Sequence, residues 1–342
     1  MRAAVFHEAG KPLTIETVAD PRPQPGQIVI AVSGAGICGS DLHITQYPGF
    51  AAPGLILGHE FAGTVAALGD GVAGDWKVGD RVTAVPLFPC KECEACDAHL
   101  PQLCPNGRFA GTTLETPGAY AQYVAARADM VQKVPAGVGD VEAAMIEPLA
   151  VGHHTFCRAD MRKGEAVLIM GGGPIGAAVA LFARAGGAAH VVVSEPAVER
   201  RERCMALGAT ATIDPSKEDP GQRFMELTGA RPSVVFECVG MPGLVQQAVN
   251  MVAIRGRVVV AGVLFTEDKV LHVPALGKEV SVIYSQAYNE RDFEAVIDAL
   301  ARNVIDAKPM HTATIGLDDV PEVFESLRNN PSQCKVLIDP AL

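Results

Sequence analysis

Four cysteines with the spacing of metal ligands are the most informative feature of this 342-residue chain. Two residues separate Cys90 from Cys93 and Cys93 from Cys96, and seven more precede Cys104. Thiolates two residues apart on a tight turn can face one point, and the longer return lets a fourth sulfur complete a tetrahedron. A closed set of four sulfurs suits a structural zinc with no open position for chemistry. Free or disulfide-bonded cysteines are the alternative, but unrelated cysteines rarely fall at this spacing.

A second set of metal donors is spread over three short motifs. Cys38 stands in GICGSDLH, His59 and Glu60 stand together in LGHEF, and Glu147 stands in IEPL. One thiolate, one imidazole and one carboxylate supply three ligands to zinc and leave a fourth position for water or substrate. Each motif is ambiguous alone, because a His-Glu pair is usually a surface pair and a single cysteine is usually a core residue.

A glycine-rich turn between an apolar strand and a helix predicts a dinucleotide site. In GGGPIG, Gly171 allows the tight turn, Gly173 lets the backbone approach a pyrophosphate, and Gly176 allows close packing of helix on strand. Pro174 and Ile175 open the helix, whose N-terminus favours the charge of the phosphates. Because this motif has both its strand and its helix, we interpret it as a cofactor fingerprint rather than an incidental turn.

An acidic residue at the end of the next strand specifies the cofactor. Glu195 lies nineteen residues after Gly176, where a carboxylate would accept hydrogen bonds from the adenosine ribose hydroxyls. A carboxylate there would repel a 2′-phosphate, so the sequence favours NAD over NADP. Arg200 on the following helix weakens this preference, because an arginine can hold that phosphate; we interpret it as a neighbour of the ribose or adenine.

The elements that must position these residues indicate an α/β fold with two parts. Up to about residue 150, short strands are broken by Gly- and Pro-rich turns, which is typical of an irregular all-β unit. From residue 165, strands that are apolar throughout alternate with helices, which indicates a parallel sheet covered on both faces. We expect strands at 166–170, 190–194, 211–213, 233–238, 257–263 and 280–284, and helices at 175–185, 198–207 and 243–252.

Composition excludes several classes of partner. The net charge of −11 argues against binding to nucleic acid or to an anionic membrane. The most apolar helical run, 177–189, is too short to cross a bilayer. Nine cysteines without an export signal predict a reducing, cytoplasmic environment, where thiols serve as metal ligands or core residues.

Taken in order along the chain, the motifs CGSDLH, GHE, the cysteine ladder, EPLAVG and GGGPIG resemble the zinc-dependent medium-chain alcohol dehydrogenases over essentially the full length. Glu147 in EPL makes the chain resemble the polyol branch of this family, since the ethanol-dehydrogenase branch has a cysteine at that position. The resemblance implies a GroES-like catalytic domain at 1–150 and 287–342 and a Rossmann NAD-binding domain, a doubly wound parallel sheet, at 151–286.

The resemblance also implies roles for individual residues. Cys38 and His59 would bind a catalytic zinc, with the four-cysteine site holding a second zinc per chain. Glu60 and Glu147 would share the third position, one on the metal and the other on a bound water, and the sequence leaves open which is which. Ser40 and His43 match the hydroxyl and the imidazole of a proton relay to solvent.

The implied function is hydride transfer between a small secondary alcohol, diol or polyol and NAD, giving a ketone, by a homotetramer or homodimer. Two other classes are disfavoured. A zinc-free quinone reductase of the same superfamily would lack Cys38, His59 and the cysteine ladder. A zinc- and nucleotide-binding protein without activity would have lost a ligand, Ser40 or a fingerprint glycine, and none is lost.

Overall fold

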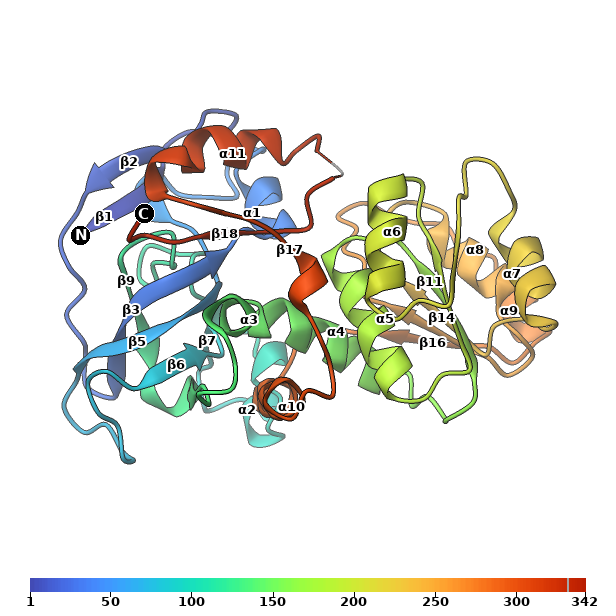
Figure 1. Ribbon diagram of the computed structural model, residues 1–342, viewed down its shortest axis with the longest axis horizontal. Coiled ribbons are helices and arrows are strands. Elements are labelled where there is room, and N and C mark those ends of the chain that lie inside the picture. Colours follow the sequence, from blue (N-terminus) through green and yellow to red (C-terminus); the bar gives the residue numbers. More distant parts are fainter. Residues whose placement is uncertain (331) are drawn as a thin grey trace. The chain divides into compact units, whose positions relative to one another are not determined.

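The computed structural model describes residues 1–330 and 332–342, and its contacts divide the chain into two compact units. The first unit combines Met1–Glu147, Asn289–Ala301 and His311–Leu342. The second combines Pro148–Tyr288 with Arg302–Met310. Figure 1 shows a mostly β-structured unit and an α/β unit, which confirms the expected fold class.

The first unit is built around one long strand, β3 (Gln27–Gly36). It pairs with β5 (Glu60–Leu68), β9 (Tyr123–Arg127) and β18 (Lys335–Ile338), all antiparallel. These strands belong to a seven-stranded sheet with the path β10-β6-β5-β3-β18-β17, in which only β17 and β18 are parallel. The remaining strands of this sheet are β6 (Arg81–Ala84), β10 (Val131–Lys133) and β17 (His311–Ile315).

Alternating apolar residues explain the core of this unit. Ile28, Ile30 and Val32 of β3 are buried at every second position and pack with apolar side chains of the neighbouring strands. At the end of β3, Gly36 is paired with Glu60 on one side and with Leu337 on the other. Residues from three distant parts of the sequence therefore meet where β3 ends.

Smaller elements complete the first unit. A three-stranded sheet has the order β2-β1-β4, and β7 pairs with β8. The strands are β1 (Arg2–Phe6), β2 (Thr14–Thr17), β4 (Leu55–Ile56), β7 (Leu87–Phe88) and β8 (Arg108–Phe109). The helices are α1 (Gly39–Ile44), α2 (Glu94–Asp97), η1 (Pro101–Leu103), η2 (Ala128–Met130), α3 (Asp140–Ala144), α10 (Glu290–Ala301), η4 (Leu317–Asp319) and α11 (Val320–Ser326), and α4 (Ile146–Arg158) continues into the second unit.

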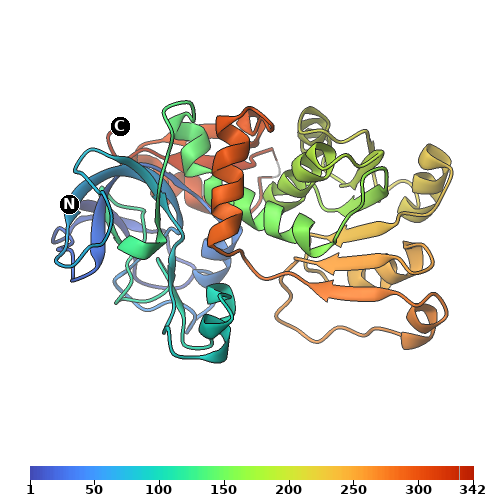
Figure 2. The same cartoon turned by 90° about the horizontal axis from the view of Figure 1, so that it is seen from below.

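The second unit contains a six-stranded parallel sheet with the order β13-β12-β11-β14-β15-β16 (Figure 2). Its inner strands are apolar and buried, so helices cover both faces. The chain reverses its direction of winding at β11, which lies between β12 and β14; such a switch point is where open α/β sheets bind ligands. The strands are β11 (Ala166–Met170), β12 (His190–Ser194), β13 (Ala211–Ile213), β14 (Val234–Glu237), β15 (Arg257–Val260) and β16 (Ser281–Tyr284).

The expected helices of the second unit are confirmed, and further ones appear. The confirmed helices are α5 (Pro174–Ala185), α6 (Val198–Ala206) and α8 (Leu244–Met251). Three others were not predicted: α7 (Pro220–Thr228), α9 (His272–Leu276) and the short η3 (Lys308–Met310). The expected strand at 257–263 ends early, at Val260. No helix in the described parts of the chain is long and apolar enough to span a bilayer.

Candidate metal and dinucleotide sites

The four sulfurs of the cysteine ladder lie at the corners of a tetrahedron. The Sγ–Sγ distances are 3.4 Å for Cys90–Cys104, 3.6 Å for Cys93–Cys96, 3.7 Å for Cys93–Cys104 and 3.9 Å for Cys90–Cys96. Zinc–sulfur bonds of about 2.3 Å in a tetrahedron place the sulfurs about 3.8 Å apart. A disulfide would need about 2.05 Å, and all four cysteines are free. The geometry fits zinc.

Local backbone donors prepare this cluster for negative charge. The N–H of Cys90 donates to Cys104 Sγ at 3.4 Å, and the N–H of Lys91 donates to Cys96 Sγ at 3.3 Å. The bond from Cys90 is the main reason that the pKa of the Cys104 thiol is lowered to about 7. For Cys93, the N–H of Cys96 acts in the same sense, but burial and hydrogen bonds among the thiols raise its pKa to about 12. A metal ion would replace these shared protons.

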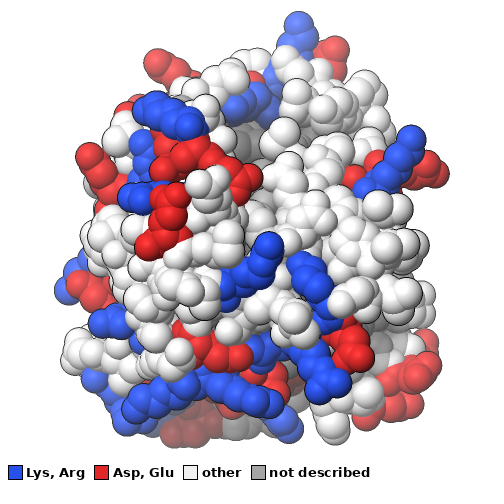
Figure 3. All heavy atoms as spheres, turned by 90° about the vertical axis from the view of Figure 1, so that its right-hand side faces the viewer, with Lys and Arg blue, Asp and Glu red and all other residues white. Residues whose placement is uncertain are grey.

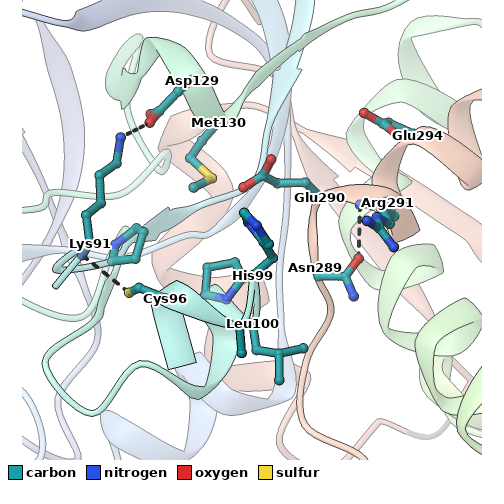
Figure 4. Close-up of a pocket in the computed structure, with 13 residues that line it drawn as sticks. Lys91, Cys96, His99, Leu100, Asp129, Met130, Asn289, Glu290, Arg291 and Glu294 are labelled. Atoms are coloured by element: carbon teal, nitrogen blue, oxygen red, sulfur yellow. Dashed lines mark hydrogen bonds and ion pairs between the residues drawn. The ribbon is translucent and has the colours of Figure 1, made fainter. Parts of the chain in front are cut away.

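A hollow in the first unit lies beside this cluster. It has a volume of about 700 Å³ and lies between α2, which carries Cys96, and the start of α10 (Figure 4). Lys91 forms an ion pair with Asp129 at its edge. Burial and the charges of Asp129 and Glu294 raise the pKa of Glu290, which lines it. Three carboxylates and two cations, Lys91 and Arg291, line this hollow, and none of the predicted catalytic donors does.

The predicted catalytic donors come together where β3 ends and β5 begins. Ligand atoms of Cys38, His59 and Glu60 lie within 4.8 Å of one another. Cys38 precedes α1 and follows the end of β3 by two residues, while Glu60 is the first residue of β5. His59 and Glu60 are buried, and Cys38 is half-buried. A thiolate, an imidazole and a carboxylate converging in a buried place fit zinc with a position left open.

Asp41 orients the imidazole of His59, a role that the sequence analysis did not assign. Its Oδ1 lies 3.5 Å from His59 Nδ1, which leaves Nε2 as the nitrogen for a metal. Burial opposes a charged imidazole, yet the charges of Asp41 and Cys38 raise the pKa of His59 well above its usual range. The site therefore attracts a cation.

Tyr120 completes this network from another strand-like segment. Its hydroxyl donates to Asp41 Oδ2 at 2.6 Å, and its side chain is fully buried. Burial and the charge of Asp41 raise the pKa of the Tyr120 phenol well above its usual range, so it remains a donor. No spacing in the sequence connects residues 41 and 120, so only the fold could reveal the pair.

Lys335 is a buried cation that the sequence analysis also missed. Its ammonium donates to both carboxylate oxygens of Glu60, at 2.6 and 2.7 Å, and to the Ile37 carbonyl at 3.2 Å. Burial lowers the pKa of Lys335, but the charges of Glu60 and Cys38 outweigh it and leave the pKa raised. A Cβ on Gly36 would come within 2.0 Å of Glu60 Oε2, so glycine makes room for this carboxylate.

The other predicted catalytic residues lie in two helices. Glu147 is buried near the start of α4, and its charge contributes to the raised pKa of Lys335. Its carboxylate is not part of the three-residue donor cluster that the described residues form. Ser40 and His43 are exposed in α1, three residues apart, and so lie on one face of that helix.

The glycine fingerprint has the backbone that a dinucleotide turn needs. Gly171 has φ +95°, which favours glycine, and it joins β11 to α5. A Cβ on Gly176 would come within 1.9 Å of the Gly171 carbonyl oxygen, while a Cβ on Gly173 would meet nothing within 4 Å. Pro174 and Ile175 begin α5, so its free N–H groups face the turn. This backbone has the tight turn expected at Gly171 and the close packing expected at Gly176, while the cofactor role of Gly173 stays a prediction.

Glu195 and Arg200 lie together just after β12. Glu195 is buried, and its Oε2 accepts a hydrogen bond from the Gly172 N–H at 2.8 Å. Arg200 lies 3.9 Å from the same oxygen. Arg201, also on α6, donates to the Glu195 and Pro196 carbonyls at 2.8 and 2.7 Å. The acidic residue is therefore fixed against the fingerprint turn.

Comparison with known proteins identifies the family to which this chain belongs. The alcohol dehydrogenase GroES-like domain model matches residues 24–136, and the zinc-binding dehydrogenase model matches residues 174–302. The chain is 35% identical to the 2-dehydro-3-deoxy-L-galactonate 5-dehydrogenase of Pseudoalteromonas atlantica, over 93% of this chain and 92% of that protein. It is 33% identical to the sorbitol dehydrogenase of Bacillus subtilis, over 99% and 97%. The chain belongs to the zinc-dependent medium-chain alcohol dehydrogenases.

Solved structures of the family agree with the fold of this dehydrogenase. RspB from Escherichia coli CFT073, in complex with NADH, has a TM-score of 0.92 at 28% identity. A protein from Sinorhizobium meliloti 1021, bound to NADP, has a TM-score of 0.91 at 30% identity. Each comparison covers 99% of both chains. This medium-chain dehydrogenase, of the polyol branch, is thus an oxidoreductase of CH–OH groups that uses zinc and a nicotinamide cofactor.

Proposed function

We propose that this dehydrogenase transfers a hydride between NAD and a small secondary alcohol, diol or polyol, with a ketone as the oxidised product. The convergence of Cys38, His59 and Glu60 within 4.8 Å is the observation that carries the proposal. The names of the relatives support the substrate class, since sorbitol is a polyol and the other relative oxidises a sugar acid at position 5.

Each residue of the metal site has a proposed task. Cys38, His59 and either Glu60 or Glu147 hold the catalytic zinc, which lowers the pKa of a coordinated hydroxyl when bound. Lys335 engages both oxygens of Glu60, which supports an exchange of ligand role between the two glutamates. Cys90, Cys93, Cys96 and Cys104 hold the second zinc, which stabilises its lobe.

Ser40 and His43 carry the substrate proton to solvent in this proposal. Their exposure on one face of α1 supports a relay, because a proton must leave a buried site by groups that reach water. The imidazole of His43 suits this task, because one ring nitrogen can accept a proton while the other donates one.

The cofactor is proposed to be NAD. The turn of Gly171, Gly173, Pro174, Ile175 and Gly176 binds the pyrophosphate, and Glu195 binds the adenosine ribose. A buried carboxylate fixed to the Gly172 N–H would repel a 2′-phosphate, which supports NAD over NADP. Arg200 lies beside this carboxylate and is proposed to flank the ribose or adenine.

We further propose that residues 1–150 and 287–342 form the catalytic domain and that residues 151–286 form the NAD-binding domain. The enzyme is proposed to work in the cytoplasm. It is proposed to assemble as a homodimer or homotetramer. Nine free cysteines support a reducing compartment. On the face drawn in Figure 3, acidic and basic side chains are interspersed with uncharged surface. Large apolar side chains are exposed in the second unit, which supports association: Ile254, Val263, Phe265, Leu271, Val273, Leu276 and Tyr284.

The test is NAD reduction by purified protein of known zinc content, with NADP in parallel. The substrate panel holds secondary alcohols, vicinal diols, polyols, sugar acids and threonine. We expect two zinc ions per chain, turnover with NAD and loss of one zinc with turnover in Cys38→Ser. Cys104→Ser is the matched control, because it should lose the other zinc. Full turnover by Cys38→Ser with both zinc ions in place would contradict the proposal.

A further inference from the structure

We propose that Tyr120 is a positioning residue for the zinc ligand His59, acting through Asp41 and through the backbone just before the ligand. The inference rests on the proposed function, since it assigns His59 to zinc. It concerns a hydroxyl 61 residues away from its ligand in the sequence, which none of the metal-binding motifs contains.

A chain of three buried groups carries the first part of the argument. The Tyr120 hydroxyl donates to Asp41 Oδ2 at 2.6 Å, and Asp41 Oδ1 lies 3.5 Å from His59 Nδ1. The relative exposures of the three residues are 0%, 1% and 9%. One carboxylate oxygen is thus held by the phenol, so the other oxygen faces the imidazole. If the phenol were absent, a buried oxygen would lose its donor, and the carboxylate could turn away from His59.

The ring of Tyr120 supports the ligand from a second direction. A Cβ on Gly58, whose φ is +98°, would come within 2.4 Å of this ring, so the ring lies directly against the residue before His59. The Tyr120 N–H donates to the Leu57 carbonyl at 2.9 Å, and the Ala119 N–H donates to the Gly58 carbonyl at 2.9 Å. The segment that carries Tyr120 therefore fixes both the backbone that leads into His59 and the carboxylate that orients its ring.

The expected consequence follows from how imidazoles bind metals. A carboxylate that accepts from Nδ1 fixes the tautomer, aims Nε2 at the metal and increases the basicity of the ligand. Loss of such an outer partner typically lowers metal affinity or activity about 10- to 100-fold. Tyr120 acts one step further out than Asp41, so its hydroxyl should contribute at the lower end of that range.

The test compares Tyr120→Phe, which removes only the hydroxyl, with Tyr123→Phe as the matched control on neighbouring β9. Zinc release to a chelator is followed for both zinc ions, and the visible spectrum is recorded after cobalt replaces zinc. We expect release of one zinc to become about 10-fold faster in Tyr120→Phe and its cobalt spectrum to shift. Release of the zinc held by the four cysteines, and both readouts in Tyr123→Phe, should equal wild type.

A double-mutant cycle shows whether the hydroxyl acts through Asp41, and its Asp41→Asn arm tests the carboxylate by itself if Tyr120→Phe folds poorly. Asp41→Asn should speed zinc release by itself, and adding Tyr120→Phe should then change little. Wild-type zinc release and cobalt spectrum in Tyr120→Phe would overturn the inference, as would fully additive effects in the cycle. A wild-type protein with one zinc or no alcohol turnover would instead overturn the proposed function, so the two failures are distinguishable.

Discussion

At the scale of single residues, Lys335 and Glu60 form a buried ion pair in the metal site. The relative exposures of the two side chains are 2% and 1%, and both Glu60 oxygens accept from the ammonium. Lys335→Met keeps the length of the side chain but leaves the carboxylate without its cation. We expect the free energy of unfolding of metal-stripped protein to fall by about 3–5 kcal/mol. Urea denaturation followed by fluorescence of Trp76, the single tryptophan, measures this.

The double variant Glu60→Gln/Lys335→Met is the control for that prediction. It removes both charges together, so no buried ion is left alone, and much of the lost stability should return. A Lys335→Met protein within 1 kcal/mol of wild type would show that water or another cation reaches Glu60.

The stability of the second unit should depend on pH through Asp214. The Ser216 hydroxyl and Lys217 lower the pKa of Asp214 from 3.8 to about 2, and Arg201 on α6 lies 3.4 Å from its carboxylate. Because the folded-state pKa is the lower one, its contribution to stability is present above pH 3.8 and is lost as the pH falls towards 2. Asp214→Asn should therefore lower the thermal midpoint at pH 6 and converge with wild type only near pH 2. An equal difference at both pH values would contradict this assignment.

Which site residues the sequence could predict depends on how far apart the partners lie along the chain. Local spacing sufficed for the cysteine ladder, for His59 beside Glu60 and for the glycine turn. Asp41 received no role from its local motif, because its partners His59 and Tyr120 come from other segments. Lys335 lies 275 residues from Glu60, and a single lysine at the start of an apolar strand carries no signal of burial.

At the scale of elements, two glycines of the dinucleotide turn have different tasks. Gly176→Ala would force a Cβ to within 1.9 Å of the Gly171 carbonyl oxygen and should destabilise the junction of β11 and α5 by about 1–3 kcal/mol. Gly173→Ala has open space around its Cβ and an ordinary φ of −67°, so it should fold normally yet bind NADH more weakly. Thermal unfolding and NADH fluorescence titration separate these effects. Wild-type NADH affinity in Gly173→Ala would remove this glycine from the cofactor site.

The elements that the sequence failed to predict have identifiable causes. Helix α7 has clear boundary signals, with Asp219 capping its N-terminus, Pro220 in its first turn and Gly229 left-handed at its end, and these could have been used. Helix α9 has five residues, none of them buried, so it lacks the apolar periodicity on which prediction depends. Strand β15 stops at Val260 although apolar residues continue, because Val263 lies exposed in the following loop.

At the scale of the whole molecule, the two units differed in how well they could be predicted. In the second unit, strands and helices alternate along the sequence, and this alternation alone indicated a parallel sheet. In the order β13-β12-β11-β14-β15-β16, the chain moves outward from β11 first to one side and then to the other. In the first unit, β18 and β17 join the sheet from the C-terminal end of the chain. Such long-range pairing leaves no local signal in the sequence.

The four-cysteine lobe should depend on its metal while the two sheets do not. Helix α2 has four residues and η1 has three, both too short to persist alone, and Lys91 and His99 have positive φ angles of 66° and 57°. The sulfurs are therefore the main restraint on this segment, and removing zinc should release it as a local unit. We expect chelator treatment to increase hydrogen exchange strongly at 90–104, with β11–β16 unchanged.

Cys104→Ser should reproduce this exchange pattern without a chelator, whereas Cys204→Ser, which changes a buried thiol of the second unit outside the cluster, should not. Because α10 faces the lobe across the hollow beside Cys96, residues 289–294 should also exchange faster when the lobe is released. Protection that stays high at 90–104 after zinc loss would mean that backbone packing, and not the metal, holds this lobe. Equal loss of protection in β11–β16 would instead show that the zinc stabilises the fold as a whole.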